Sequence, residues 1–364
     1  MIPMVDLRRQ YNILKTEIDA AILNVLNNGQ FILGPDVSEL EREVAVYHGV
    51  PCAIGVASGT DALLLALAAC GIGEGDEVIT TPFTFIATAE VISLLHAKPV
   101  FVDICPDTFN IDPQKIERKI TRRTKAIIPV HLFGHPAEMD AIVTLCRKYH
   151  LKIIEDCAQS FGALYYGEKV GTFGDAGCFS FFPSKNLAGY GDGGMVITRN
   201  EETAEKIKLL RNHGSETKYY HKVPGYNSRL DEIQAAIIRV KLRMIDNFNK
   251  ARRGNADIYR ASITRDDIVL PMEMAGCRHV YHQFTVRSKK RDLIMASLIA
   301  NNISSAIYYP VPLHRQEAFA CWKTGDDNLI NSEICAAEVL SLPMFPELEE
   351  KEILHISDVI NHAS

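Results

Sequence analysis

Short apolar runs alternate with segments of helical periodicity through the first half of the chain. The apolar runs predict strands at residues 53–57, 77–81, 99–103, 126–130 and 152–156. The segments between them predict helices that begin at 58–60 and that cover 86–95, 113–120 and 138–149, and two further helices, 10–27 and 36–48, precede the first strand. Strands that alternate with helices in this way indicate βαβ units and a mainly parallel sheet with both faces covered.

The pattern changes after Arg229. Apolar runs at 176–182 and 195–198 extend the predicted sheet, but residues 230–260 then have the periodicity of one long helix. Two predicted strands, 279–287 and 304–309, and two predicted helices, 292–301 and 348–360, follow it. We therefore predict a large α/β domain over residues 1–245 and a smaller α+β domain over residues 246–364.

A lysine follows the strand predicted at 176–182. The stretch SFFPSKNLAGYGDGGM places Lys185 after Pro183 and before a glycine-rich turn, and a further apolar run begins at Met195. A lysine at a strand end can be an active amine, because a partly buried ammonium loses its proton readily and can form a Schiff base. The alternative is a surface lysine on a loop, and this stretch alone favours neither interpretation.

Two polar groups stand where other predicted strands end, which is where open α/β sheets bind ligands. Ser58–Thr60 joins a strand to a helix N-terminus, whose free N–H groups suit a phosphate. Plain N-capping by Ser58 is the alternative. Asp156 ends the apolar run IIED, and a carboxylate there requires a cationic or N–H partner. An internal salt bridge would also satisfy it.

Two more candidates lie close to these in the predicted sheet. Ser180, five residues before Lys185, can reach the same phosphate, or its hydroxyl can be satisfied within the sheet. Phe85, in TPFTFIATAE, offers a flat ring for stacking, or it belongs to the ordinary core. Pyridoxal phosphate needs a lysine, a carboxylate for its ring nitrogen, a phosphate site and a stacking group together, so the set is more specific than any member.

Composition narrows the class of protein. The chain has 364 residues, of which 47% are apolar and 23% charged, as in ordinary soluble globular proteins. A net charge of −6 argues against a nucleic-acid partner. Nine cysteines without a C-x-x-C pair indicate a reducing, cytoplasmic location rather than disulfides or a zinc site. No apolar run approaches the ~20 residues of a membrane span, and the N-terminus lacks a signal-peptide core. His131, His135 and His150 lack metal-ligand spacing, so no metal is expected.

The chain resembles the sugar aminotransferases of the DegT/DnrJ/EryC1/StrS family, within the fold-type-I superfamily of pyridoxal-phosphate enzymes. The resemblance runs nearly end to end. It rests on these stretches, in order: FILGPDVSELE, ASGTDAL, GDEVITTPFTFIATAE, PVFVDI, TKAIIPVHLFG, IIEDCAQSFGA, SFFPSKNLAGYGDGG and YNSRLDEIQAA.

The resemblance implies a role for each candidate residue around the cofactor. Lys185 would form the Schiff base with the cofactor and move the proton between the substrate Cα and the cofactor C4′. Asp156 would hold the pyridine nitrogen, Gln159 would lie near the phenolic oxygen, and Phe85 would stack on the ring. The phosphate would be held by Gly59, Thr60 and Ser180.

The resemblance also implies a homodimer with shared active sites. Asn227, in YNSRLDE, would reach the phosphate from the neighbouring subunit. Arg229, from the same stretch, would line the sugar-nucleotide side together with Tyr308 and Tyr309 of IYYPVP. The residues alone indicate only a loop at Asn227 and a strand at Tyr308–Tyr309.

The expected reaction is the transfer of an amino group from L-glutamate, which leaves as 2-oxoglutarate, to a nucleotide-linked keto sugar. Within the family the pattern is most similar to enzymes that aminate C3 of a UDP-linked sugar, such as a UDP-2-acetamido-3-oxo-hexose, for surface glycans (lipopolysaccharide, O-antigen or lipid A). Enzymes that act on the 3-oxo-glucuronate often carry His-Tyr where this chain has Tyr308–Tyr309. A uronate or a dTDP-3-keto-6-deoxyhexose are the alternative substrates.

Two rival functions share the fold. Sugar dehydratases of the family replace the lysine with histidine, so Lys185 argues against that reaction. A catalytically silent regulatory protein would be expected to have lost part of the set, whereas Lys185, Asp156, Ser180 and Asn227 are all present.

Overall fold

A seven-stranded sheet forms the centre of the protein in a computed structural model that describes residues 1–322 and 328–363. The strand order is β1-β9-β8-β5-β4-β2-β3. Strand β9 is antiparallel to both of its neighbours, and the other pairs are parallel, so the sheet is mainly parallel as predicted. The strands are β1 (Cys52–Val56), β2 (Glu77–Thr80), β3 (Lys98–Phe101), β4 (Thr124–Ile127), β5 (Lys152–Asp156), β8 (Ala176–Ser180) and β9 (Gly194–Thr198).

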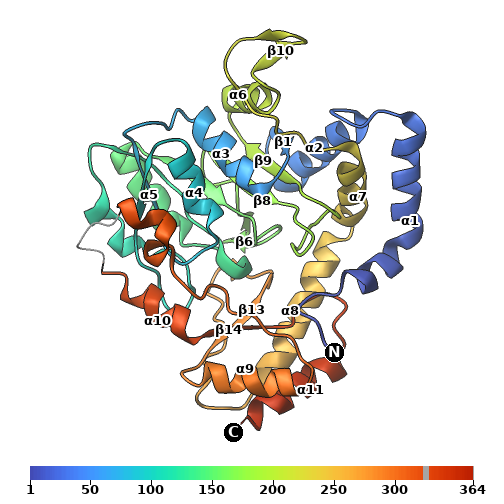
Figure 1. Ribbon diagram of the computed structural model, residues 1–364, viewed down its shortest axis with the longest axis vertical. Coiled ribbons are helices and arrows are strands. Elements are labelled where there is room, and N and C mark those ends of the chain that lie inside the picture. The colour runs from blue at the N-terminus through green and yellow to red at the C-terminus, as the bar shows by residue number, and fades with distance from the viewer. Residues whose placement is uncertain (323–327, 364) are drawn as a thin grey trace.

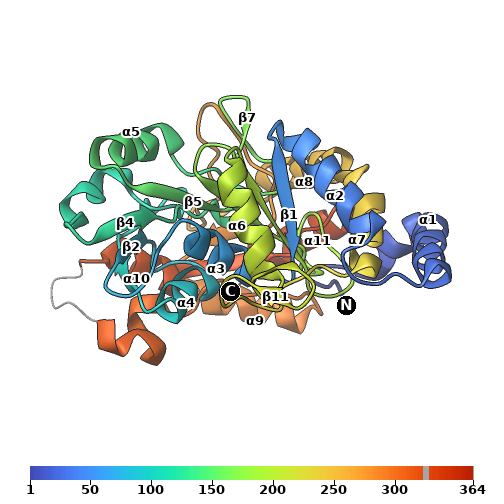
Figure 2. The same ribbon diagram turned by 90° about the horizontal axis from the view of Figure 1, so that it is seen from above.

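Helices cover both faces of this sheet (Figures 1 and 2). Successive side chains of a strand point to opposite faces, so Ile153 joins one buried cluster and Ile154 the other. Helices α3 (Gly59–Ala69), α4 (Ala87–Leu94) and α6 (Glu201–Arg211) pack on the Ile154 face. Helices α2 (Pro35–His48), α5 (Met139–Tyr149) and α7 (Glu232–Leu242) pack on the Ile153 face. Apolar side chains on both faces explain why the strands have continuous rather than alternating apolar sequences.

A separate cluster of buried residues lies in the C-terminal part of the chain, at the bottom of Figure 1. Its elements are α8 (Ile245–Ser262), β13 (Phe284–Arg287), α9 (Arg291–Ala300), β14 (Val339–Leu342) and α11 (Glu350–Asn361). Strands β13 and β14 pair antiparallel. The cluster agrees with a smaller α+β unit, while the division into 1–245 and 246–364 stays a prediction.

The remaining elements flank these two cores. Helix α1 (Leu7–Asn28) packs against α7, and α10 (Ile330–Glu338) leads into β14. A small sheet contains β12 (Cys277–Arg278), β6 (Leu164–Tyr165) and β7 (Glu168–Lys169). The hairpin of β10 (Ser215–Thr217) and β11 (Tyr220–His221) projects from the top of the molecule in Figure 1. In the described part of the chain, no helix has both the length and the apolar character to cross a membrane.

Three predicted elements are wrong in detail. The long helix at 230–260 is broken into α7 and α8, with Arg243 and Met244 between them. The helix predicted at 113–120 consists of two short 3₁₀ turns, Pro113–Lys115 and Glu117–Lys119. The strand predicted at 304–309 is absent from the described structure, and only Ala306 forms an isolated bridge, to Ser341. Helices α6 and α10 and strand β14 were not predicted.

Candidate active site

A pocket of about 660 Å³ opens at the carboxyl ends of the parallel strands. Strands β1, β5 and β8 end at Val56, Asp156 and Ser180, so the residues at and just beyond those ends reach the same edge of the sheet. The pocket brings together most of the site residues predicted from the sequence: Gly59, Thr60, Phe85, Asp156, Gln159, Ser180, Lys185, Tyr308 and Tyr309.

The turn Ser58–Thr60 forms one end of the pocket. Ser58 is the N-cap of α3, and its Oγ accepts a hydrogen bond from the backbone N–H of Asp61 at 3.0 Å. A Cβ added to Gly59 would lie 2.6 Å from Cβ of Ser180, so only glycine lets the end of β8 approach the helix. Gly194 is equally confined, since its Cβ would lie 2.3 Å from the carbonyl oxygen of Ser58. Helix N-terminal N–H groups beside the Ser180 hydroxyl suit a phosphate.

Asp156 lies at the end of β5 and is only 5% exposed. Its Oδ2 accepts a hydrogen bond from Oγ1 of Thr88 at 2.8 Å, and its Oδ1 accepts one from the N–H of Ala158 at 3.1 Å. Burial raises the pKa of this carboxyl, and the two hydrogen bonds and the charge of Lys185 offset part of that effect. A cationic ligand group beside Asp156 would favour its ionised form further.

Lys185 lies in the turn between β8 and β9. Burial lowers the pKa of its amine to about 8, against the opposing attraction of Asp156. A larger fraction of the amine is therefore unprotonated near neutral pH than for an exposed lysine, as a nucleophile requires. Contacts with α7 and α8 fix the turn: Tyr190 N–H donates to Oε1 of Gln234 at 2.7 Å, and Asn186 Nδ2 donates to Oδ1 of Asn249 at 2.8 Å.

Gln159 connects two walls of the pocket. Its Nε2 donates to the hydroxyl of Tyr309 at 3.0 Å, and its Oε1 accepts from the N–H of Phe133 at 2.7 Å. The Phe85 ring is 55% exposed and its centroid lies 6.4 Å from that of Tyr309. An exposed ring inside a pocket leaves a face on which a ligand ring can stack. Tyr308 lines the same wall as Tyr309.

Two predicted residues lie outside the pocket of their own chain. Asn227 is exposed, and its Oδ1 accepts a hydrogen bond from Nη2 of Arg229 at 2.6 Å. Nη1 of Arg229 donates to Oδ1 of Asn212 at 3.2 Å. Neither Asn227 nor Arg229 lines the pocket, so the structure of one chain does not bring them to the other site residues.

The sequence reasoning missed several residues in or behind the pocket. Thr84 lines the pocket, and Thr88, which contacts Asp156, stands four residues later near the start of α4, a spacing that places two side chains on one face. This spacing was a usable signal. His282 and Gln283 line the pocket from the C-terminal part of the chain, where the sequence YHQF carries no recognisable pattern.

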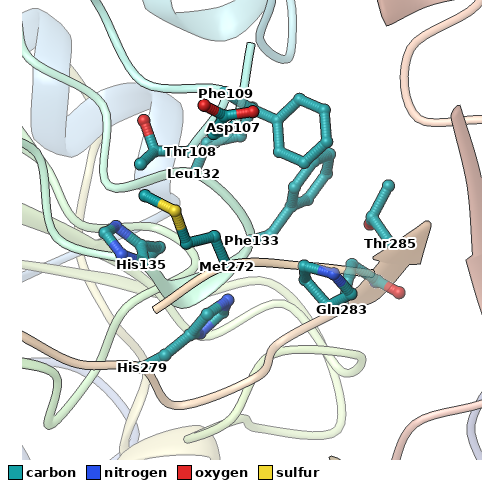
Figure 3. A pocket seen from close by; sticks show the side chains of 11 residues that line it. Asp107, Thr108, Phe109, Leu132, Phe133, His135, Met272, His279, Gln283 and Thr285 are labelled. Carbon is teal, nitrogen blue, oxygen red and sulfur yellow. The ribbon is translucent and has the colours of Figure 1, made fainter. Parts of the chain in front are cut away.

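A second cavity lies next to Gln283 and is far smaller (Figure 3). Its volume of about 10 Å³ is near the minimum for one water molecule. The rings of His135 and His279 meet edge to face beside it, with centroids 5.5 Å apart, and burial lowers the pKa of His135 to about 4. This cavity is too small for a cofactor or a sugar, and we assign it to packing.

One buried group among the described residues has the composition of a metal site, namely His131, Glu155 and Cys157. The Glu155 carboxylate already accepts hydrogen bonds from the N–H groups of Gly171, Phe173 and Gly174, and Nε2 of His131 lies 3.1 Å from it. Nδ1 of His131 accepts from the N–H of Ala137. Hydrogen bonds within the protein thus satisfy the carboxylate and the imidazole.

The fold and the pocket define the class of protein. A half-buried lysine, a buried carboxylate and a glycine-tight helix N-terminus at one edge of the sheet fit the aldehyde, the ring nitrogen and the phosphate of pyridoxal phosphate. The protein is a fold-type-I, pyridoxal-phosphate-dependent aminotransferase. Residues 12–361 match the model of the DegT/DnrJ/EryC1/StrS aminotransferase family, and the chain belongs to that family.

Individual relatives extend over the whole chain. It is 51% identical over 359 residues to a UDP-N-acetyl-3-dehydro-alpha-D-glucosamine 3-aminotransferase of Acidithiobacillus ferrooxidans, covering 99% of this chain and 97% of the relative. It is 49% identical over 362 residues to a "Pleiotropic regulatory protein" of Geobacillus stearothermophilus, with the same coverage of 99% and 97%. The crystal structure of DesV from S. venezuelae, with a ketimine intermediate, matches with a TM-score of 0.96 and 43% identity, covering 99% of this chain and 97% of that one.

Proposed function

We propose that the protein transfers an amino group from L-glutamate to the C3 keto carbon of a UDP-linked 2-acetamido-3-oxo-hexose. The observation that carries the proposal is that Lys185 and Asp156 line one pocket with the phosphate-binding turn Ser58–Thr60. The choice of sugar draws support from the 51% identity to the aminotransferase of Acidithiobacillus ferrooxidans. The amino sugar that forms would be used in the synthesis of a surface glycan such as lipopolysaccharide.

Each residue of the pocket has a separate role in the proposed reaction. Bound pyridoxal phosphate supplies an electron sink and a temporary carrier of the amino group. Nζ of Lys185 takes the proton from Cα of the amino donor and, in the second half-reaction, delivers a proton to C3 of the sugar. Asp156 holds the proton of the ring nitrogen in place, and Gly59, Thr60 and Ser180 hold the phosphate. Gln159 orients Tyr309, which closes the sugar side of the pocket.

The pocket of one chain holds few cations, which suits a neutral sugar. Lys185 is the one lysine or arginine among the described residues that line it, and burial keeps the pKa of His282 well below its ordinary value, so that imidazole is neutral. The carboxylate of a 3-oxo-glucuronate, like those of L-glutamate, would find no arginine of its own chain in the pocket, and Arg229 of the partner subunit would be the cation that pairs with it in our proposal. A neutral N-acetylhexosamine avoids that desolvation cost. A dTDP-3-keto-6-deoxyhexose is also neutral at the sugar and is the second candidate substrate.

Asn227 and Arg229 complete the site, in our proposal, from a second subunit. Both lie outside the pocket of their own chain and contact Asn212, which precedes the projecting hairpin of β10 and β11. The hairpin exposes Tyr219 (81%) and Tyr220 (74%), large side chains of the kind that are enriched in interfaces. The active unit is then a homodimer with shared sites.

Mixing two inactive variants tests this sharing. Lys185→Ala and the double variant Asn227→Ala/Arg229→Ala should each lose most activity alone. After dissociation and reassociation in equal amounts, half of the dimers are mixed and each carries one intact site, so about a quarter of wild-type activity should return. If Asn227 and Arg229 serve their own chain, mixing restores nothing.

The cellular setting is also part of the proposal. The nine cysteines are free thiols in the described structure, which agrees with a reducing compartment and supports the cytoplasm as the place of the reaction. The identity of the nucleotide follows from the substrate tests below.

The visible absorption of the cofactor-loaded protein tests the function. Excess L-glutamate should remove the visible band of the bound cofactor and produce the near-ultraviolet band of its amine form. The candidate keto sugars, UDP-linked and dTDP-linked, can then be ranked by how fast each restores the first spectrum. If the protein binds the cofactor but responds to no amino acid and no keto sugar, it is the catalytically silent regulator instead. The name of the Geobacillus relative, a regulatory protein, is the reason to test for this outcome.

A further inference from the structure

Two threonines connect Asp156 to the pocket through a chain of hydroxyl groups. Oγ1 of Thr88 lies 2.8 Å from Oδ2 of Asp156, and Oγ1 of Thr84 lies 3.2 Å from Oγ1 of Thr88. All three side chains are buried, with exposures of 3% for Thr84, 0% for Thr88 and 5% for Asp156. Thr84 lines the pocket, whereas Thr88 does not. Thr88 thus reaches a ligand only through its neighbours.

The chemistry of the groups fixes the direction of this chain. An ionised carboxylate only accepts hydrogen bonds, so the one proton of the Thr88 hydroxyl is committed to Asp156. The contact between the two hydroxyls then requires Thr84 to donate and Thr88 to accept. With its proton committed, Oγ1 of Thr84 offers the pocket an acceptor and no donor. Protonation of Asp156 would allow the chain to reverse.

Helix α4 holds the inner threonine in a favourable place for an anion. Thr88 is in the first turn of the helix, which begins at Ala87, and the N-terminal end of a helix carries partial positive charge. The backbone of Asp156 is fixed as well, because its N–H donates to the carbonyl of Pro129 and its carbonyl accepts from the N–H of His131. The hydroxyl and the carboxylate therefore meet as two immobile groups.

We propose that Thr88 is a positioning residue that holds Asp156 as an oriented carboxylate for the cofactor's ring nitrogen, and that Thr84 is the outer member of the same one-way chain. Burial works against the charge of Asp156, and a hydroxyl donor to a carboxylate is among the stronger hydrogen bonds in a protein. Charged and titratable neighbours of Asp156 are Lys185, His131, Tyr309, Cys157 and Cys178. Lys185 reacts with the cofactor aldehyde in the proposed function, on which this inference rests, so Thr88 is left as a fixed donor.

Thr84 has a consequence for the second substrate. Because its oxygen presents only an acceptor, a ligand group that faces it must be a donor, such as a hydroxyl, an amide N–H or an amine. A carbonyl or carboxylate oxygen at that position would meet an acceptor and be disfavoured. This agrees with a neutral, hydroxyl-rich sugar in the pocket.

The affinity for the cofactor, measured by titrating the apoprotein, tests the role of Thr88. Thr88→Val keeps the shape of the side chain and removes the hydroxyl, and we expect the dissociation constant of pyridoxal phosphate to rise about ten-fold, in line with the loss of one hydrogen bond to a charged group. Thr88→Ser keeps the hydroxyl and should stay within about two-fold of wild type. Thr84→Val, one bond further away, should have a smaller effect than Thr88→Val.

A cofactor analogue separates positioning from packing. In 1-deazapyridoxal phosphate a C–H replaces the ring nitrogen, so the analogue gains nothing from an oriented Asp156. Thr88→Val should bind it as tightly as the wild type does. Equal binding of pyridoxal phosphate by the valine and serine variants would overturn the proposal, and so would an equal loss of affinity for cofactor and analogue.

The binding experiment remains informative if Thr88→Val fails to fold, and also if the proposed function is wrong. Thr88→Ala also lacks the hydroxyl and carries the same expectation, so a valine variant that fails to fold leaves the comparison with Thr88→Ser intact. The measured quantity is cofactor binding rather than turnover, so a wild-type protein that binds the cofactor but takes no amino group from L-glutamate would contradict the proposed function and leave this inference standing.

Discussion

Lys185→Ala should abolish amino transfer while leaving the fold intact. Lys185 supplies the one primary amine among the described side chains that line the pocket, and its lowered pKa of about 8 keeps part of that amine unprotonated and able to take a proton from Cα. We expect transamination of L-glutamate to fall by at least about a thousand-fold, as for loss of a nucleophile that is also the general base. Single-turnover kinetics with the cofactor-loaded variant give the size of the loss.

Lys250→Ala is the matched control for this variant. Lys250 is an exposed lysine on α8, so its removal should change neither the rate nor the visible spectrum. Transamination by Lys185→Ala at the wild-type rate would mean that another group moves the proton, and the mechanism proposed for Lys185 would then be wrong.

Asp156→Asn should give the second-largest loss. An amide cannot balance the charge of a protonated ring nitrogen, so the bound cofactor would be a weaker electron sink. We expect the rate of the first half-reaction to drop by about 10² to 10³, the usual effect of removing one preorganised electrostatic contact. The measurement is the rate at which L-glutamate changes the cofactor spectrum in a stopped-flow experiment.

Asp266→Asn provides the control for that charge change, since Asp266 is exposed and lies outside the pocket. An electrostatic role of Asp156 also predicts the result of a second substitution. Asp156→Glu keeps the charge at a displaced position and should retain more activity than the asparagine variant. If the asparagine variant reacts as fast as the wild type, the carboxylate is dispensable and the ring nitrogen has another partner.

The sequence revealed the sheet well because its strands are unambiguous. Each is a short apolar run bounded by turn residues, and burial on both faces makes such runs continuous. The break between α7 and α8 was invisible because it falls at Arg243 and Met244, without a glycine or a proline to mark it. The run at 304–309 is apolar because Tyr308 and Tyr309 form a pocket wall, and apolar character alone does not distinguish a wall from a strand.

The sequence predicted those site residues that stand at strand ends within one chain. Lys185, Asp156 and the turn Ser58–Thr60 stand at strand ends, so their proximity follows from a parallel sheet. His282 and Gln283 line the pocket only because the C-terminal part packs against the sheet, and no local sequence pattern predicts that packing. Asn227 depends on a second chain, in our proposal, and its position was suggested by family resemblance rather than by spacing.

The two sides of the pocket come from distant parts of the chain. The turn at Ser58–Thr60, with Asp156 and Lys185, is built on the central sheet, whereas residues 307–310 line the same pocket from the C-terminal part. If residues 307–310 contact the sugar, as we propose, substitutions there can change the accepted sugar while the residues proposed to hold the cofactor stay unchanged. The same fold can then give enzymes for different sugars that differ mainly at residues 307–310.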